Sequence, residues 1–449
     1  MKFEDTLARW LPGQRWYPGT AAIRDLAITS QITLAAGDPE LRHLIVTVSA
    51  GGPPVCYQVI AGLRSEVPET LRPRVIGPAG NGQTAYDALH DPALAGLLLS
   101  GMAGKQTVGP LRFASEPGAD IDTTLPSRVL TAEQSNTSLV FGDVAILKVL
   151  RRPFPGQHPD LEVNRALAKR GSPHVAEPLG WIETTADGEP VLLAILSRFL
   201  PDARDGWSLA LASVDALADF SAEAFALGQA TAQVHADLAA AFGTTELGPG
   251  ASAELASQMS ARLDAALNEV PELGQYAERV RARFAELARQ RVPLRVQRVH
   301  GDYHLGQVLR AQSRWVILDF EGEPSVPLQQ RRAHGVTLRD VAGMLRSFDY
   351  AARHRLLERP DAGKVSGRAA AGPTRALQRV LSGKADEWAR RSQAAFCDGY
   401  AAAGGEDPAA SAVLLRALML DKAVYEVVYE ARHRRSWISI PLGAIGQLS

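Results

Sequence analysis

The 449-residue sequence predicts an α+β protein in which a sheet-rich N-terminal part precedes a larger helical C-terminal part. Strand-like apolar runs lie before residue 200, and alanine-rich amphipathic stretches dominate after residue 206. The chain is too long for one compact core, which suggests two or three domains. Hydrophobic residues make up 46% and charged residues 22%, close to an ordinary globular composition.

Residues 1–125 are predicted to form an α+β unit. The runs at 44–48 and 55–60 alternate as strands do, and 86–99 has the pattern of a helix. The segment 116–126 contains proline and glycine and is the first plausible domain boundary.

Residues 126–202 are predicted to form a second sheet-rich segment. Two apolar runs flank Gly142-Asp143, which is a good hairpin signal. The segment 160–170 follows as a helix, and 191–199 is apolar throughout, as a buried strand is.

Residues 203–449 are predicted to be mainly helical, with alanine-rich amphipathic stretches at 208–241 and 252–290. Strands interrupt them at 296–320, and 358–375 is loop-like. A small sheet-rich lobe before a large helical lobe is the two-lobe plan of kinases.

Charge and cysteine content exclude several classes of protein. The formal net charge of −1 gives no sign of a nucleic-acid or acidic-membrane partner. Only two cysteines occur, Cys56 and Cys397, so a disulfide framework is not expected. The acidic start at Glu4 and Asp5 does not resemble a signal peptide, and no apolar run approaches membrane-spanning length. We expect a cytoplasmic monomer.

The strongest chemical signal is a His-Gly-Asp-Tyr-His loop that contains Asp302 and is followed by a strand ending at Asp319. Phosphoryl transfer requires a carboxylate that orients the acceptor hydroxyl and Mg²⁺ ions that neutralise the phosphates. Asp302 suits the first role, while Gln307 and Asp319 suit metal ligation. The alternatives are a zinc site formed by His300 and His304, or structural carboxylates at strand ends. Gly301 between the histidines and Gly306 after them favour a loop.

The nucleotide is expected to bind a segment that lies between two strands, just before the predicted hairpin. Small polar residues there can present donors to phosphate oxygens, as a glycine-rich loop does. They are Gln134, Ser135, Asn136, Thr137 and Ser138. Lys148 lies in an otherwise apolar strand and would contact the phosphates, with Glu162 as its orienting carboxylate. A polar β-turn and an exposed edge-strand lysine are the alternatives.

A third cluster lies near the C-terminus. Lys422, Tyr425, Glu426 and Tyr429 share one face of a predicted helix. Donors, acceptors and aromatic rings together suit a polyhydroxylated ligand, whereas a solvated face with salt bridges is the alternative.

These segments together resemble the actinobacterial maltokinase family, which is related to aminoglycoside phosphotransferases and protein kinases. The segments that carry the resemblance are 14–17, 132–138, 300–307, 319–324, 339–348 and 421–426. The resemblance implies a bilobal protein-kinase-like fold that uses ATP and Mg²⁺. Residues 1–125 would be an N-terminal cap domain, 126–202 the N-lobe, and 203–449 a helical C-lobe with the acceptor pocket.

Three departures from the maltokinase pattern concern the acceptor. Maltokinases have Ser-Pro-Leu-Arg-Asp at 336–340, an acidic residue at Met419 and Arg-Pro-x-Trp at 434–437. The phosphoryl-transfer residues are unchanged. A related group phosphorylates glucosamine, whose ammonium needs a carboxylate partner. Maltose would need a longer pocket with an aromatic platform.

The predicted acceptor contacts are Asp302, His304, Asp421, Lys422, Tyr425, Glu426, Glu430 and Trp437. The departures favour glucosamine, giving glucosamine 6-phosphate, over maltose, giving maltose 1-phosphate. An aminoglycoside phosphotransferase and a catalytically inactive kinase-like binding protein are the remaining alternatives. The cap and the intact Asp302, Asp319 and Lys148 argue against them.

Overall fold

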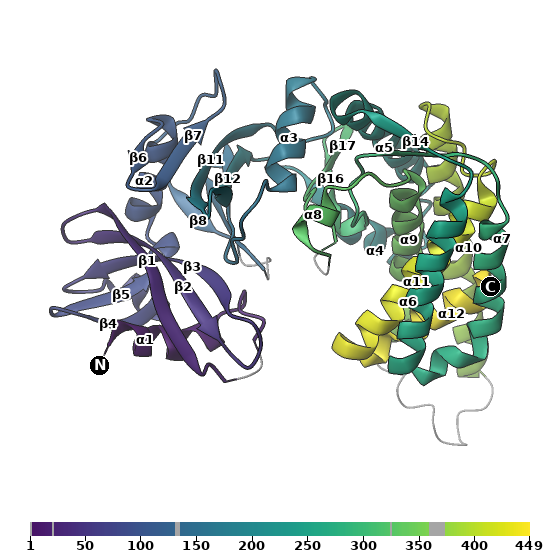
Figure 1. The fold of residues 1–449 in the computed structure, drawn as a ribbon, viewed down its shortest axis with the longest axis horizontal. Coiled ribbons are helices and arrows are strands. Elements are labelled where there is room, and N and C mark those ends of the chain that lie inside the picture. Colours follow the sequence, from purple (N-terminus) through teal and green to yellow (C-terminus); the bar gives the residue numbers. More distant parts are fainter. Residues whose placement is uncertain (1, 20–21, 131–134, 324–325, 359–372) are drawn as a thin grey trace. The chain divides into compact units, whose positions relative to one another are not determined.

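The computed structural model describes residues 2–19, 22–130, 135–323, 326–358 and 373–449. The described chain forms two compact units (Figure 1). The N-terminal unit comprises Met1–Arg165 and Ala176–Pro201, and the C-terminal unit comprises Ala166–Val175 and Asp202–Ser449. Gln134 and most of the predicted loop at 358–375 lie outside the described residues.

The N-terminal unit begins with helix α1 (Phe3–Trp10) packed on an antiparallel sheet of order β1-β2-β3-β5-β4. The strands are β1 (Asp25–Ala35), β2 (Glu40–Ser49), β3 (Val55–Arg64), β4 (Val75–Gly80) and β5 (Gln83–Asp87). The two strands predicted at 44–48 and 55–60 are confirmed as parts of β2 and β3.

The helix predicted at 86–99 begins later than expected. Tyr86 lies in β5, and helix α2 (Pro92–Ala103) starts after Asp91, whose side chain accepts a hydrogen bond from Ala93 N. Asp91 is thus an N-cap, and Pro92 occupies the first helical position that proline favours. The prediction placed the start too early because the apolar character of the strand runs into that of the helix.

The second sheet of this unit has the order β6-β7-β11-β12-β10-β9-β8. Its strands are β6 (Thr107–Val108), β7 (Leu111–Ser115), β8 (Ser127–Val129), β9 (Thr137–Phe141), β10 (Ala145–Val149), β11 (Pro178–Ala186) and β12 (Glu189–Arg198). The predicted hairpin is confirmed as β9 and β10. Gly142 and Asp143 between them have φ of 49° and 54°, a conformation that glycine and aspartate tolerate better than most residues. Helix α3 (Pro159–Lys169) confirms the helix predicted at 160–170.

Buried polar groups join the two sheets. Gln58 in β3 donates from Nε2 to the carbonyls of Leu150 and Leu193, at 2.7 and 2.9 Å. Arg151, directly after β10, is 1% exposed and donates from Nη2 to Asp87 Oδ2 at 2.7 Å. Its Nε donates to Thr137 Oγ1 at 2.8 Å. The first sheet is therefore anchored to β9, to β12 and to the segment that follows β10 in the second sheet.

The C-terminal unit is largely helical. Its helices are α4 (Gly206–Asp215), α5 (Ser221–Phe242), α6 (Ala251–Glu269), α7 (Ala277–Ala288), α8 (Leu328–Arg331), α9 (Leu338–Glu358), α10 (Pro373–Ala402), α11 (Ala412–His433) and α12 (Ser439–Leu448). Helix α9 packs against both α10 and α11, and α11 also packs against α6 (Figure 1). Within the described ranges, no helix has both the length and the apolarity needed to cross a membrane.

Two small sheets interrupt these helices. One pairs β13 (Arg204–Asp205), β16 (Val308–Ala311) and β17 (Arg314–Ile317), and the other pairs β14 (Thr244–Leu247) with β15 (Leu294–Gln297). The strands predicted at 296–320 are thereby confirmed. The loop between β15 and β16 contains Asp302.

Candidate active site

Asp302 lies beside a lysine from a distant helix. Lys422 in α11 donates from Nζ to Asp302 Oδ1 at 3.2 Å, and the two side chains are 24% and 23% exposed. Lys422 Nζ also lies 4.9 Å from the centre of the Tyr425 ring, within the range of a cation–π contact. The loop and α11 therefore present one carboxylate and one ammonium side by side.

The backbone of the Asp302 loop is held by Asp340 in α9. Asp340 Oδ2 accepts from His300 N at 2.7 Å, and Oδ1 accepts from Gly301 N at 2.9 Å. His235 Nε2 lies 3.0 Å from the same Oδ2. Gly301 has φ of +87°, which a residue with a Cβ rarely adopts. A buried carboxylate thus fixes the two residues that precede Asp302.

The His300 ring connects the loop to the strand end that carries Asp319. Its Nε2 donates to the Leu318 carbonyl at 2.8 Å, and its Nδ1 accepts from Asp302 N at 3.3 Å. These partners require the tautomer that has hydrogen on Nε2. His300 is therefore a positioning residue rather than a zinc ligand.

Close packing against α9 fixes the rest of the loop. A Cβ on Gly343 would lie 2.5 Å from the Tyr303 carbonyl oxygen, so only glycine allows this approach. The buried Tyr303 hydroxyl is 2.8 Å from Thr231 Oγ1, and Leu305 N donates to Ser347 Oγ at 3.0 Å.

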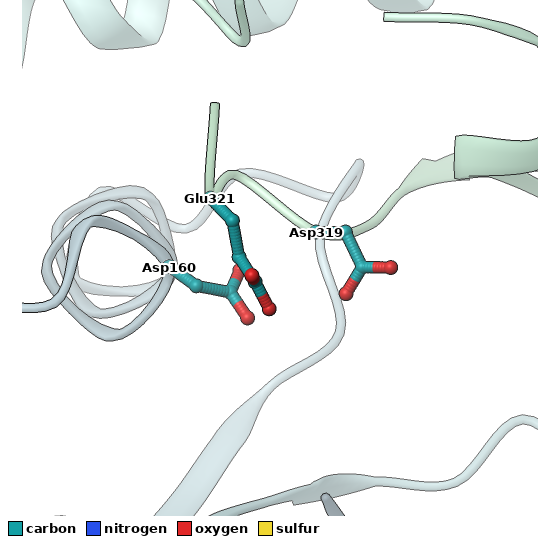
Figure 2. A group of neighbouring side chains, drawn as sticks. All are labelled: Asp160, Asp319 and Glu321. Atoms are coloured by element: carbon teal, nitrogen blue, oxygen red, sulfur yellow. The ribbon is translucent and has the colours of Figure 1, made fainter. Parts of the chain in front are cut away.

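Gln307 and Asp319 flank the paired strands at one end of the β16–β17 hairpin. Val308 pairs with Ile317, and Leu318 N donates to the Gln307 carbonyl at 2.9 Å. Figure 2 shows Asp319 and Glu321 on the segment that follows β17. A carboxylate oxygen of Glu321 lies within 4.8 Å of one from Asp319. Glu321 is therefore an additional candidate metal ligand that the sequence prediction did not include.

Behind Lys422 lies a buried pair of charges. Glu426 Oε2 accepts from Arg346 Nε at 3.0 Å and from Nη2 at 2.7 Å, and the Arg346 side chain is fully buried. Arg346 also pairs with Asp349. Glu426 was predicted to contact the acceptor; its carboxylate pairs with this arginine, which compensates its burial, and its contact with an acceptor stays a prediction.

Electrostatics keep both members of the Asp302–Lys422 pair charged. Burial alone would raise the pKa of Asp302, but Lys422 and then His304 outweigh it, so the pKa lies below its usual value. Burial would lower the pKa of Lys422, but Asp302 and Glu426 raise it above the usual value. Burial lowers the pKa of His304, whose Nδ1 accepts from Gly306 N at 3.1 Å.

A pocket opens beside this pair, and we call it the Lys422 pocket. Its walls comprise Arg262, Gly301, Tyr303, Glu323, Arg339, Gly343, Leu418, Asp421, Lys422 and Tyr425. Three predicted acceptor contacts, Asp421, Lys422 and Tyr425, therefore share one pocket. Glu323 adds a second wall carboxylate that the sequence prediction did not include.

Glu430 and Trp437 belong to another cluster. Glu430 is 1% exposed and accepts from Arg434 at 3.0 and 2.8 Å and from the Tyr350 hydroxyl at 3.2 Å. The Trp437 ring packs on His354, with ring centres 4.7 Å apart. As far as the described residues show, neither residue lines the Lys422 pocket, and their contact with an acceptor stays a prediction.

The predicted phosphate-binding residues lie in the N-terminal unit. Thr137 and Ser138 are buried at the start of β9, and Ser135 and Asn136 precede them. Lys148 Nζ lies 3.7 Å from Asp160 Oδ2, in the first turn of α3. Asp160 is thus a carboxylate partner of Lys148 that the sequence prediction did not name. Glu162 lies in the same turn, and its pairing with Lys148 stays a prediction.

The sequence of this chain is similar to those of known phosphotransferases. Residues 128–377 match the phosphotransferase enzyme family, so the chain belongs to that family. Residues 10–91 match the maltokinase N-terminal cap domain. A glucosamine kinase from Streptacidiphilus jiangxiensis is 31% identical over 366 residues, covering 77% of this chain and 78% of the relative. A glucosamine kinase from Mycolicibacterium smegmatis (strain ATCC 700084 / mc(2)155) is 31% identical over 341 residues, covering 73% of this chain and 80% of the relative.

Solved structures show the same fold. A glucosamine kinase in complex with glucosamine, ADP and inorganic phosphate has a TM-score of 0.67 and 24% identity, covering 100% of this chain and 99% of that one. A glucosamine kinase in crystal form B has a TM-score of 0.70 and 24% identity, covering 100% of this chain and 99% of that one. The predictions of a kinase-like phosphotransferase and of relationship to the maltokinase and glucosamine kinase group are therefore confirmed.

Proposed function

We propose that this protein transfers the γ-phosphate of ATP to glucosamine, giving glucosamine 6-phosphate. The observation that carries the proposal is the Asp302 carboxylate, paired with Lys422 beside a pocket whose wall includes Glu323 and Asp421. Glucosamine carries an ammonium group, which binds best beside carboxylates. The curated relatives named above are glucosamine kinases, which supports the same acceptor.

Asp302 would accept a hydrogen bond from the acceptor hydroxyl and orient it for attack on the phosphate. Its lowered pKa keeps it ionised at neutral pH, which this role requires. Lys422 holds one oxygen, Oδ1, so the other carboxylate oxygen can accept from the hydroxyl. Asp340 and His300 keep the loop in place for this contact.

Mg²⁺ suits the donor set at the end of the β16–β17 hairpin. Gln307, Asp319 and Glu321 can each offer a side-chain oxygen, the kind of ligand that Mg²⁺ prefers. Bound Mg²⁺ would neutralise charge on the phosphates. In the N-terminal unit, residues 135–138 and Lys148 would bind the ATP phosphates, and Asp160 would orient the lysine.

Maltose is the second candidate, because residues 10–91 match the cap domain of maltokinases. The cap lies in the N-terminal unit, whereas the predicted acceptor contacts lie in the C-terminal unit. The cap match therefore says little about the acceptor. The Lys422 pocket also lacks, within the described chain, the Trp437 platform predicted for a disaccharide.

The test is the product formed from Mg-ATP and glucosamine, analysed by mass spectrometry and NMR. We expect glucosamine 6-phosphate, and we expect Asp302→Asn to form it about 10²- to 10⁴-fold more slowly while still binding ATP. A product phosphorylated at the anomeric carbon, or no sugar phosphate at all, would refute the proposed reaction. Normal turnover by Asp302→Asn would remove Asp302 from the mechanism.

A further inference from the structure

A second, larger pocket adjoins the Lys422 pocket in the C-terminal unit. We call it the Leu247 pocket. The two pockets share four wall residues: Arg262, Arg339, Leu418 and Asp421. Because they share these residues, the two pockets are neighbours.

The shared wall residues include an ion pair between two helices. Arg262 in α6 donates from Nε and Nη2 to Asp421 Oδ1 and Oδ2 in α11, at 2.8 and 2.7 Å. Two parallel hydrogen bonds hold a guanidinium and a carboxylate in one plane. Asp421 is 14% exposed in its side chain, whereas Arg262 is 45% exposed. The planar Arg262–Asp421 pair lies in the wall that the two pockets share, and we call it the partition.

The far pocket has walls that suit a sugar ring. Leu247, Leu255, Leu294 and Val296 supply apolar surface of the kind that packs on the C–H faces of a pyranose.

Polar side chains stand around that apolar surface. Glu254, Gln258 and His334 also line the Leu247 pocket and can exchange hydrogen bonds with hydroxyl groups. Carboxylate, amide and imidazole groups together offer both donors and acceptors, as a neutral polyhydroxylated ligand needs.

We infer that the Arg262–Asp421 pair limits the length of the acceptor by closing a second sugar subsite in the Leu247 pocket. This inference rests on the proposed sugar-kinase function and adds a specificity determinant to it. With the pair formed, a monosaccharide fills the Lys422 pocket. With the partition removed, a second ring attached to the first can enter the neighbouring pocket.

The test compares Arg262→Ala with a matched control on the same two helices. Arg432 in α11 makes a similar two-bond pair with Glu269 in α6, at 2.5 and 2.6 Å, and it does not line either pocket described above. Partly exposed ion pairs contribute little to stability, so both variants should fold. The acceptors are glucosamine, the β-1,4-linked glucosamine dimer and maltose.

We expect Arg262→Ala to raise kcat/KM for the dimer relative to glucosamine at least tenfold, and Arg432→Ala to leave this ratio at the wild-type value. An unchanged ratio in Arg262→Ala would overturn the inference, as would a wild-type protein that already uses the dimer as well as glucosamine.

Binding of the dimer without ATP, measured by calorimetry, gives a readout that does not depend on turnover. Tighter binding to Arg262→Ala than to wild type and to Arg432→Ala supports the subsite, and equal binding overturns it. Absence of glucosamine phosphorylation by wild type would instead refute the proposed function, so the two failures are distinguishable.

Discussion

Replacing Lys422 by methionine tests how the acceptor-orienting carboxylate is kept ionised. Methionine has about the length of the lysine stem but no charge, so the change removes the 3.2 Å contact with Asp302 Oδ1 while largely preserving packing. Asp302 then remains in a partly buried site without its principal opposite charge.

The size of the effect follows from the geometry. At an effective dielectric constant of about 20, unit charges at this separation attract each other by roughly 5 kcal/mol. The two side chains are 24% and 23% exposed, so solvent screens part of this attraction. A charge-assisted hydrogen bond retains about 1.5–3 kcal/mol. We therefore expect kcat/KM for glucosamine to fall about 10- to 150-fold at acidic pH, where activity follows the ionised fraction of Asp302.

The pH dependence of kcat/KM tests the role of Lys422 more specifically than the loss of activity does. The pKa of Asp302 is lowered by Lys422 against the opposing effect of burial, so in the wild type the carboxylate stays ionised as the pH falls below neutral. In Lys422→Met the lysine charge is gone, but burial still disfavours the ionised carboxylate. The pKa of Asp302 therefore rises. The acid limb of the kcat/KM profile should therefore move to higher pH.

The assay is ADP release from Mg-ATP and glucosamine across this pH range, with Arg416→Met as a control, because Arg416 is exposed on the same helix. A Lys422→Met profile with the same acid limb as wild type would refute the role assigned to Lys422. A similar shift in Arg416→Met would show that net charge, not the contact, is responsible.

Three further predictions concern stability and the metal. Arg151→Met breaks the buried pair with Asp87 and should lower the free energy of unfolding by about 3–5 kcal/mol, seen as a lower melting temperature; a loss below about 1 kcal/mol would contradict this. Asp319 has φ of +58°, which asparagine tolerates, so Asp319→Asn should keep the fold but lose at least about 10²-fold in turnover through weaker metal binding. Turnover by this variant at the wild-type rate would exclude Asp319 as a ligand. Removing divalent cations with EDTA should abolish turnover and excess Mg²⁺ should restore it, whereas EDTA-resistant activity would contradict the metal assignment.

The sequence predicted best those features that depend on neighbouring residues. The β9–β10 hairpin, helix α3 and the β16–β17 strands follow from local apolar patterns and turn residues. Gln307 and Asp319 lie at one end of the β16–β17 hairpin, and their metal ligation stays a prediction.

Contacts between residues far apart in the sequence cannot be predicted from local patterns. Lys422 lies 120 positions after Asp302, and their contact depends on how α11 packs in the C-terminal unit. Glu426 was identified as a functional carboxylate, but its arginine partner is 80 positions earlier, in α9. A single sequence shows that a buried carboxylate needs a cation, but it does not show which one.

The sequence also contains a pattern that predicts buried charges at Asp340 and Arg346. Both are charged residues in a helix whose other residues from 338 to 348 are largely apolar, and both are buried. A charge in such a helix requires a fixed partner. That reasoning would have marked α9 as the support of the active-site loop.

The most direct test of the central claim is the acceptor preference of the purified protein with Mg-ATP. ADP release would be compared for glucosamine, glucose, N-acetylglucosamine, maltose and kanamycin. A charge-assisted hydrogen bond to the amine is worth about 1.5–3 kcal/mol, so glucosamine should exceed glucose in kcat/KM by about tenfold or more. Equal use of glucosamine and glucose, or preference for maltose or kanamycin, would contradict the account.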